Sequence, residues 1–319
     1  MSRYEAAFWL LPVAAYFLLP GYLVLGSQIL IVSLFALSLD LILGYAGILS
    51  LGHAAFFGLG AYTAGLLAVH GWGEPLSGLA AAALVAGSIG FAASFLVVRG
   101  EDLTRLMVTL GLGLLLYEAA NRAAHITGGV DGLSGVVMGK IFGVFSFDLA
   151  GRTAYVYSFA VLFALFLLLK RVVASPFGLA LRGIRENRTR MPALGVPVRR
   201  RLVAAFTLAA TIAGIAGALL TQTTQFVGID TLSFDRSADL LIMLVLGGTG
   251  RLYGAILGTA AFMIARDYLS GINPVYWEFW LGCLLVVFVL SARGGILGGL
   301  DAIRNAAGKR RRKKDAVRQ

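Results

Sequence analysis

The sequence has few of the residues that form disulfides, metal centres and charged surfaces. Its 319 residues include one cysteine and three histidines, and 13% of them are charged, against roughly 25% in ordinary soluble domains. The lone Cys283 excludes an intramolecular disulfide and a cysteine-based metal site. His53, His70 and His125 lie too far apart in the sequence for a metal-binding motif. Disulfide and metal chemistry are therefore not expected.

Apolar residues are in excess instead. They make up 59% of the chain, and runs of about 18 or more of them predict membrane-spanning helices. We place apolar segments at residues 8–19, 23–43, 53–70, 76–98, 103–121, 154–170, 202–222, 238–247, 252–266 and 275–292. The expected fold is an all-α polytopic membrane protein of about ten transmembrane helices, some of them broken or short. Residues 1–303 would form the transmembrane domain and residues 304–319 a basic cytoplasmic tail.

The positive charge predicts the topology. The net charge is +11, and 17 of the 27 Lys and Arg residues lie in two stretches, nine in 170–201 and eight in 304–318. Because translocation of basic residues is disfavoured, both stretches and both termini are expected on the cytoplasmic side of the membrane. The tail would anchor the topology and contact anionic lipid. Nucleic-acid binding is not expected.

This topology requires a break in the apolar stretch 237–264. A single helix there would place the basic tail on the side opposite to residues 170–201. Gly247, Gly248 and Gly250 can supply the positive φ angles of a tight turn, so we expect two short helices joined by a cytoplasmic turn. Arg236 would then lie on the outer side.

A second group of glycines interrupts the second apolar segment. Gly44, Gly47 and Gly52 precede the segment that starts at His53, and Ser50 could cap its helix. Irregular backbone at membrane depth is tolerated only where it is buried or lines a cavity, and transporters use such breaks at substrate sites. The candidates for a substrate pathway here are Gly44, Gly47, Ser50, Gly52 and His53. A plain cytoplasmic hairpin turn is the alternative interpretation.

Other polar residues in the apolar segments are sparse. Thr221, Gln222 and Gln225 lie at an outer helix end, where they could line the entrance of a transport pathway. Asp40 and Asp239 lie near predicted helix ends, so placement at the membrane interface is expected for both.

A short amphipathic helix is predicted within the cytoplasmic loop 172–201. Ser175 and Pro176 form a helix start, and Pro192 should end or kink the helix. An apolar stripe flanked by arginines allows two interpretations of this helix. The helix could lie along lipid headgroups, or it could dock in the groove of a cytoplasmic partner. The residues assigned to its contacts are Phe177, Leu181, Arg182, Ile184, Arg185 and Glu186.

Four stretches together resemble the permeases of ABC importers of the branched-chain amino acid (LivM) type. "SPFGLALRGIRENRTRMPALGVPV" (175–198) resembles the cytoplasmic coupling segment of that family, and "LSLDLILGYAGILSLGHAAFFGLGAYT" (37–63) its early segment. "TGGVDGLSG" (127–135) is similar to its external loop, and residues 213–260 resemble its C-terminal half. The chain departs from the family at "RTRMP" (188–192), where an acidic residue and alanines are usual, which leaves the detailed ATPase contact open.

The resemblance implies a non-enzymatic pore subunit without a cofactor of its own. Family members pair with a second, homologous permease, bind two cytoplasmic ATPases and receive substrate from an external binding protein. In agreement, the sequence contains no G-x-x-x-x-G-K-[ST] phosphate loop, so a partner chain would bind ATP. Uptake of urea or short-chain amides is the alternative within the class. A self-contained secondary transporter or channel is the alternative outside it.

Overall fold

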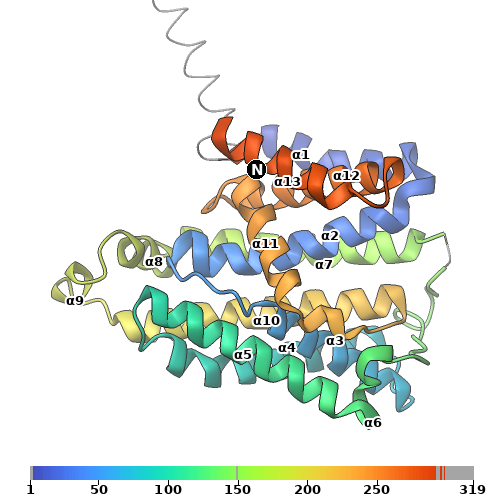
Figure 1. The fold of residues 1–319 in the computed structure, drawn as a ribbon, viewed down its shortest axis with the longest axis horizontal. Coiled ribbons are helices and arrows are strands. Elements are labelled where there is room, and N and C mark those ends of the chain that lie inside the picture. Colours follow the sequence, from blue (N-terminus) through green and yellow to red (C-terminus); the bar gives the residue numbers. More distant parts are fainter. Residues whose placement is uncertain (1–2, 149, 292–294, 297, 299–319) are drawn as a thin grey trace, which may run out of the picture.

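The computed structural model describes residues 3–148, 150–291, 295–296 and 298, so the predicted basic tail 304–319 lies outside the described residues. The described chain is largely α-helical, with turns and loops between the helices (Figure 1). The membrane helices of its first half are α1 (Arg3–Leu18), α2 (Leu23–Asp40), α3 (Ala54–Val69), α4 (Pro75–Val97) and α5 (Asp102–Arg122). Those of its second half are α7 (Arg152–Ala174), α10 (Val198–Thr224), α11 (Phe234–Gly247), α12 (Leu252–Ile272) and α13 (Trp277–Ser291). Shorter helices are α6 (Ala124–Thr127), α8 (Pro176–Glu186) and α9 (Arg190–Ala193).

The predicted fold class is confirmed, because every predicted apolar segment coincides with a helix. Among the described residues, five helical stretches are long and apolar enough to cross a membrane, and the bent pair α11–α12 would make a sixth. Apolar stretches of α1, α3 and α13 are shorter. The number of ten crossings stays a prediction, because these short helices do not cross a bilayer by their own length.

Most of the long helices run in one general direction, and the bundle has two distinct ends (Figure 1). α8 and α9 lie at one end, called here the α8 end, and α6 lies at the opposite end, called the α6 end. Helix α11 crosses the front of the bundle obliquely. The basic residues of 170–201 predict that the α8 end lies in the cytoplasm.

Helix α10 packs closely against α3 and α4, and small residues make this possible. A side chain at Gly60 of α3 would collide with the backbone of Gly214, and one at Gly214 would collide with Ala86 of α4. Ala210, Gly214 and Ala218 recur every four residues and form a stripe of small residues on α10, in which both alanines are fully buried. The stripe therefore allows close helix packing, as its spacing predicts.

The predicted break between α11 and α12 is present, and the two helices are bent by 115°. Gly248 and Gly250 have φ angles of 102° and 78°, as the tight turn requires. The prediction for Gly247 is wrong: it ends α11 without a positive φ angle. Its role is close packing, because a side chain there would collide with the backbone of Gly254.

Asp40 is fully buried within the protein, and its expected placement at the membrane interface stays a prediction. Its Oδ1 accepts a hydrogen bond of 2.6 Å from the backbone N–H of Gly250. The carboxylate therefore joins the end of α2 to the α11–α12 turn, 210 residues away in the sequence. A π-helical turn, η2 (Leu41–Tyr45), follows directly.

Candidate functional site

Two helices begin side by side in the interior of the bundle. The backbone N–H of Ala54, at the start of α3, donates to the hydroxyl of Ser237 in the first turn of α11, at 2.9 Å. Ser233 caps α11, and its hydroxyl accepts from the N–H of Arg236 at 3.2 Å. The positive ends of two helix dipoles therefore lie close together. We call this place the meeting point.

The meeting point is separated from the α6 end of the bundle by the length of α3. A side chain added at Gly65 of α3 would touch Val227, and one added at Gly58 would touch Leu232. Residues 227–237 therefore run along α3 from the neighbourhood of Gly65 to the start of the helix. Helix α3 has 16 residues and is therefore about 24 Å long. Since the hydrocarbon core of a bilayer is about 30 Å thick, the start of α3 is far from the α6 end of the membrane domain.

The first irregular segment that reaches the meeting point is residues 46–53, which we call the inner break. It starts near α8, where a side chain at Gly47 would touch Arg185, and ends beside α5. Among its residues Ala46, Ile48, Ser50 and His53 are all buried. The segment is therefore not a surface hairpin turn, and its use at a substrate site stays a prediction.

The three predicted glycines of this region are each required by the backbone. Gly47 has a φ of 71°. A side chain at Gly44 would collide with Asp40 and with the backbone of Gly250, and one at Gly52 would collide with the carbonyl of Thr109 in α5. The inner break is therefore held by close backbone packing.

Two predicted polar residues of the inner break are buried rather than exposed to a pathway. The ring Nε2 of His53 lies 2.8 Å from the hydroxyl of Ser38, and the ring stacks on Phe35 at a centroid distance of 5.7 Å. Ser50 is fully buried, and its hydroxyl has no hydrogen-bond partner among the described residues. Ser50 does not cap α3, whose start follows His53.

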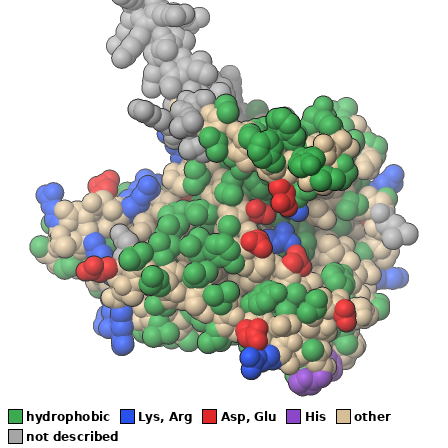
Figure 2. Space-filling model, in the orientation of Figure 1, with side chains coloured by type: hydrophobic (Ala, Val, Ile, Leu, Met, Phe, Trp, Pro, Cys, Tyr) green, Lys and Arg blue, Asp and Glu red, His purple; other side chains and the backbone are tan. Residues whose placement is uncertain are grey.

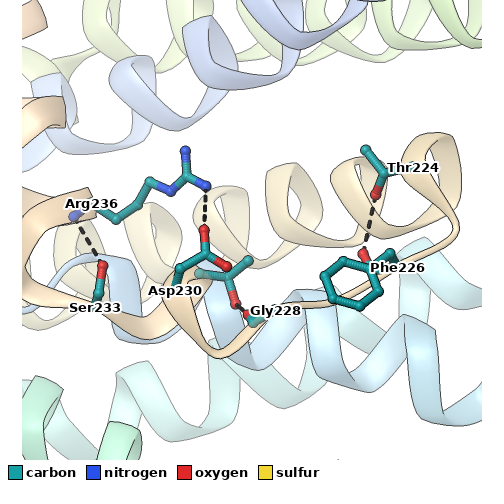
Figure 3. Close-up of polar contacts among 7 residues, drawn as sticks. Thr224, Phe226, Gly228, Asp230, Ser233 and Arg236 are labelled. Carbon is teal, nitrogen blue, oxygen red and sulfur yellow. Dashed lines mark hydrogen bonds and ion pairs between the residues drawn. The ribbon is translucent and has the colours of Figure 1, made fainter. Parts of the chain in front are cut away.

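The second irregular segment, residues 225–233, leads from the end of α10 to the start of α11, and we call it the outer break (Figure 3). Arg236 pairs with Asp230 at 2.9 Å, and the Thr231 hydroxyl donates to the carbonyl of Gly228 at 2.8 Å. Sequence reasoning missed this segment. The signal was available, since Ser233 followed by an acidic residue two positions later is typical of a helix start.

The outer break opens onto a charged face. Asp239 interacts electrostatically with Arg266 and Arg236, and also with two residues of its own sign. Acidic and basic side chains gather near the middle of the front face, between apolar areas (Figure 2). The charged face comprises Asp230, Asp235, Arg236, Asp239, Arg266 and Glu278. Arg236 therefore lies beside the meeting point, and its expected position on the outer side of the membrane stays a prediction.

Contact between the charged face and lipid is energetically unfavourable. A charged side chain at the centre of a membrane helix costs about 2.5–3.5 kcal/mol on insertion scales. Pairing reduces that cost for Arg236, whose side chain is 27% exposed, but its partner Asp230 remains 67% exposed. The charged face therefore requires protein or water against it.

The meeting point itself is closed. A cavity of about 10 Å³ remains between the inner break, α5 and α11, lined by Gly52, Gly113 and Ser237 among others. One water needs about 10–15 Å³ of such space, so nothing as large as an amino acid fits. Passage of a substrate through this place requires the two helix starts to separate.

The polar residues expected at a pathway entrance are used for packing instead. Thr221 and Gln222 are fully buried. The hydroxyl of Thr221 donates to the carbonyl of Ala61 at 3.0 Å. The side-chain amide of Gln222 donates to the carbonyl of Pro75 at 2.7 Å. Gln225 is exposed and ends α10 in a left-handed conformation with φ 55°. Thr221 and Gln222 therefore connect helices and line no entrance in this structure.

The amphipathic helix forms as α8, and its apolar stripe faces the membrane domain. Leu181 and Ile184 are buried, and Phe177 packs against the same core. Ser175 precedes the helix as predicted, but its hydroxyl donates to the carbonyl of Val172 and does not cap α8. Pro176 occupies the first turn. The helix is seated on the bundle by its apolar residues.

The arginines of α8 contact the membrane domain as well. Arg185 donates to the carbonyl of Gly44, at the start of the region that contains the inner break. The guanidinium of Arg182 lies 5.2 Å from the ring centroid of Tyr45 in a cation–π contact. Glu186, the last residue of α8, is exposed. The predicted contacts of these arginines with ATPase carboxylates stay a prediction.

Comparisons with known proteins identify the family of the chain. The model of the family described as "Branched-chain amino acid transport system / permease component" matches residues 22–290. The chain is similar to the high-affinity branched-chain amino acid transport system permease protein LivM of Escherichia coli (29% identity) and of Salmonella typhimurium (30%). Both alignments cover 87% of this chain and 70% of the relative.

More distant similarity extends to an archaeon. A probable branched-chain amino acid transport permease protein LivM of Methanocaldococcus jannaschii is 25% identical over 48% of this chain and 51% of its own length. No solved structure matches the chain significantly. The family model spans all helices from α2 to α13, including both breaks and α8. The chain therefore belongs to the branched-chain amino acid transport permease family.

Proposed function

We propose that this chain is a membrane subunit of an ATP-driven importer for branched-chain or related hydrophobic amino acids. Separate ATPase subunits would bind and hydrolyse ATP, since the sequence has no phosphate-binding loop. An external binding protein would deliver the substrate. Family membership and the names of the similar permeases support this function.

The observation that carries the proposal is the contact between α8 and the inner break. Arg185 is bonded to Gly44, and a side chain at Gly47 would touch Arg185. The chain from Gly44 leads within ten residues to the start of α3 at the meeting point. A displacement of α8 by a bound ATPase therefore acts on the segment that closes the bundle interior, which is what an ATP-driven gate requires.

The charged face is the surface against which we place the second permease subunit and the translocation pathway. It lies beside the meeting point and carries both signs of charge. A face with both signs complements a zwitterionic amino acid better than it complements neutral urea or an amide. This supports amino acids as the substrate class.

Copurification in mild detergent tests the proposed assembly. We expect the tagged chain, expressed from its native genome, to retain a P-loop ATPase and a second permease. Recovery of a homo-oligomer without an ATPase would contradict the proposal and favour a self-contained transporter or channel.

A variant of α8 tests the coupling. Leu181 is fully buried, so Leu181→Ala should remove about 2–5 kcal/mol of packing and abolish substrate-stimulated ATP hydrolysis. Leu179 lies on the same helix but is 61% exposed, and Leu179→Ala is the matched control. Equal coupling in the two variants would show that the seat of α8 does not transmit motion.

We place the α8 end and both termini in the cytoplasm of a bacterial inner membrane, because the basic residues 170–201 lie at that end. Arg251→Cys and Ser134→Cys should react with an impermeant thiol reagent from opposite sides of the membrane. The exposed Cys283 must first be replaced by alanine. Labelling of both sites from one side would overturn this orientation.

A further inference from the structure

An open groove of about 780 Å³ runs between α4 and α10, away from the meeting point. Phe91 and Phe95 form one wall, and one face of α10 forms the other. The α10 residues in it are Arg199, Arg200, Val203, Ala204, Thr207, Leu208 and Thr211. The groove begins at the α8 end, where α10 starts.

The walls of the groove are apolar over most of their length. The hydroxyls of Thr207 and Thr211 donate to carbonyls of their own helix, Val203 and Thr207, so they present little unsatisfied polarity. The ring centroids of Phe91 and Phe95 lie 4.9 Å apart in an edge-to-face contact. No acidic residue is among the described residues that line it. Such walls favour a hydrocarbon occupant.

The groove has the dimensions of one membrane leaflet. From Arg200 to Thr211, α10 rises roughly 17 Å, which is about half of the ~30 Å hydrocarbon core. Its two arginines lie at the end that corresponds to the lipid headgroups. A molecule that fills the groove therefore has a tail about one leaflet long and a head beside the arginines.

The positive charge of Arg199 and Arg200 indicates the chemistry of the bound headgroup. Arg199 and Arg200 are exposed, and within the described part of the chain neither guanidinium has a hydrogen-bond or ion-pair partner. The positive end of the α10 dipole lies beside them. Basic pockets between membrane helices on the cytoplasmic side bind anionic lipid headgroups. We propose that the groove binds an anionic glycerophospholipid, with its phosphate on Arg199 and Arg200 and an acyl chain between α4 and α10.

The site adjoins the segment that carries α8. The guanidinium of Arg201 lies 5.5 Å from the ring centroid of Phe177 in α8, and Arg188 donates to the carbonyl of Val98 at the end of α4 at 2.9 Å. A lipid on Arg199 and Arg200 therefore lies next to the residues that attach the α8–α9 segment to the bundle. This inference does not depend on the transported substrate.

Native mass spectrometry of the purified chain tests the site. The delipidated protein is titrated with dioleoyl phosphatidylglycerol and, in parallel, with dioleoyl phosphatidylcholine. We expect the wild type to prefer phosphatidylglycerol, and Arg199→Gln/Arg200→Gln to bind it at least tenfold more weakly. Arg171→Gln/Arg190→Gln is the control, because it removes the same charge from exposed arginines at the same end but outside the groove. Equal losses in the two variants would overturn the site.

A second variant tests the apolar part. Ala204 is exposed in the groove, so Ala204→Phe should fill it and weaken phosphatidylglycerol binding while both arginines remain. Thermal unfolding and size-exclusion profiles verify that each variant is folded. If Ala204→Phe leaves lipid binding unchanged but releases a second permease subunit, the groove is a protein interface and the proposal is wrong.

Discussion

The two breaks lead to the same place but are stabilised by different means. The inner break is buried and depends on glycines that allow backbone contact with α5 and α8. The outer break is anchored by the buried Val227 and Leu232 and by backbone hydrogen bonds between Val227 and Leu133. Its partly exposed end is fixed in addition by polar side chains, through the Asp230–Arg236 pair and the Ser233 cap. A segment fixed by packing resists local change, whereas one fixed by local polar bonds can rearrange its bonds when another molecule approaches.

This difference suggests separate tasks at the meeting point. Motion of α8 reaches it through the inner break, because Arg185 is attached there. The charged face reaches it through the outer break, because Asp230 of the outer break pairs with Arg236 in the first turn of α11. Substitutions in the inner break should therefore affect folding and the coupling of α8 to the meeting point. Substitutions in the outer break should affect substrate passage.

The largest effect is expected from Gly52→Ala. Its methyl group would collide with the carbonyl of Thr109, and backbone cannot move aside as a flexible side chain can. Overpacking typically costs about 1–3 kcal/mol and can exceed this, so we expect a fall of several degrees in the apparent Tm and loss of the assembled complex. Gly111→Ala on α5 is the control, because nothing lies within 4 Å of its added methyl group. Equal stability of the two variants would contradict the role of close packing at the inner break.

A smaller effect on stability but a large one on transport is expected from Arg236→Gln. The Asp230–Arg236 pair is partly exposed, so its loss should cost only about 0–1 kcal/mol. Uptake should nevertheless fall by at least tenfold if the charged face lines the pathway. Arg122→Gln breaks the exposed Glu118–Arg122 pair on α5 and should leave uptake unchanged. Normal uptake in Arg236→Gln would separate the outer break from transport.

The smallest effect is expected from Ser233→Ala. Removing the cap of α11 should cost about 1 kcal/mol, measured as a small fall in apparent Tm. Ser175→Ala is the matched control, because Ser175 stands before α8 without capping it. A larger fall for Ser175→Ala would show that α11 does not depend on its cap.

The sequence predicts the helices and the inner break well, for a local reason. Apolar runs and the glycines at positions 44, 47 and 52 are visible within short windows. Thr221 and Gln222 were misplaced because their partners, Ala61 and Pro75, lie 160 and 147 residues away in the sequence. The charged face was missed for the same reason, since Arg236 and Arg266 come together only through the bend between α11 and α12. Local patterns identify elements, and distant contacts decide what their polar groups do.

The shortness of the two helices that start at the meeting point bears on how the chain enters the membrane. With 16 and 14 residues, α3 and α11 are about 24 and 21 Å long, less than the hydrocarbon core. Neither can be inserted as an ordinary span, and the unbonded backbone of the segments before them cannot face lipid. Both must therefore be taken up by helices that are already in place, α2 and α10 among them. Biogenesis of this protein should consequently include a late step, after insertion of the long helices, in which the two short ones are folded into a preformed bundle.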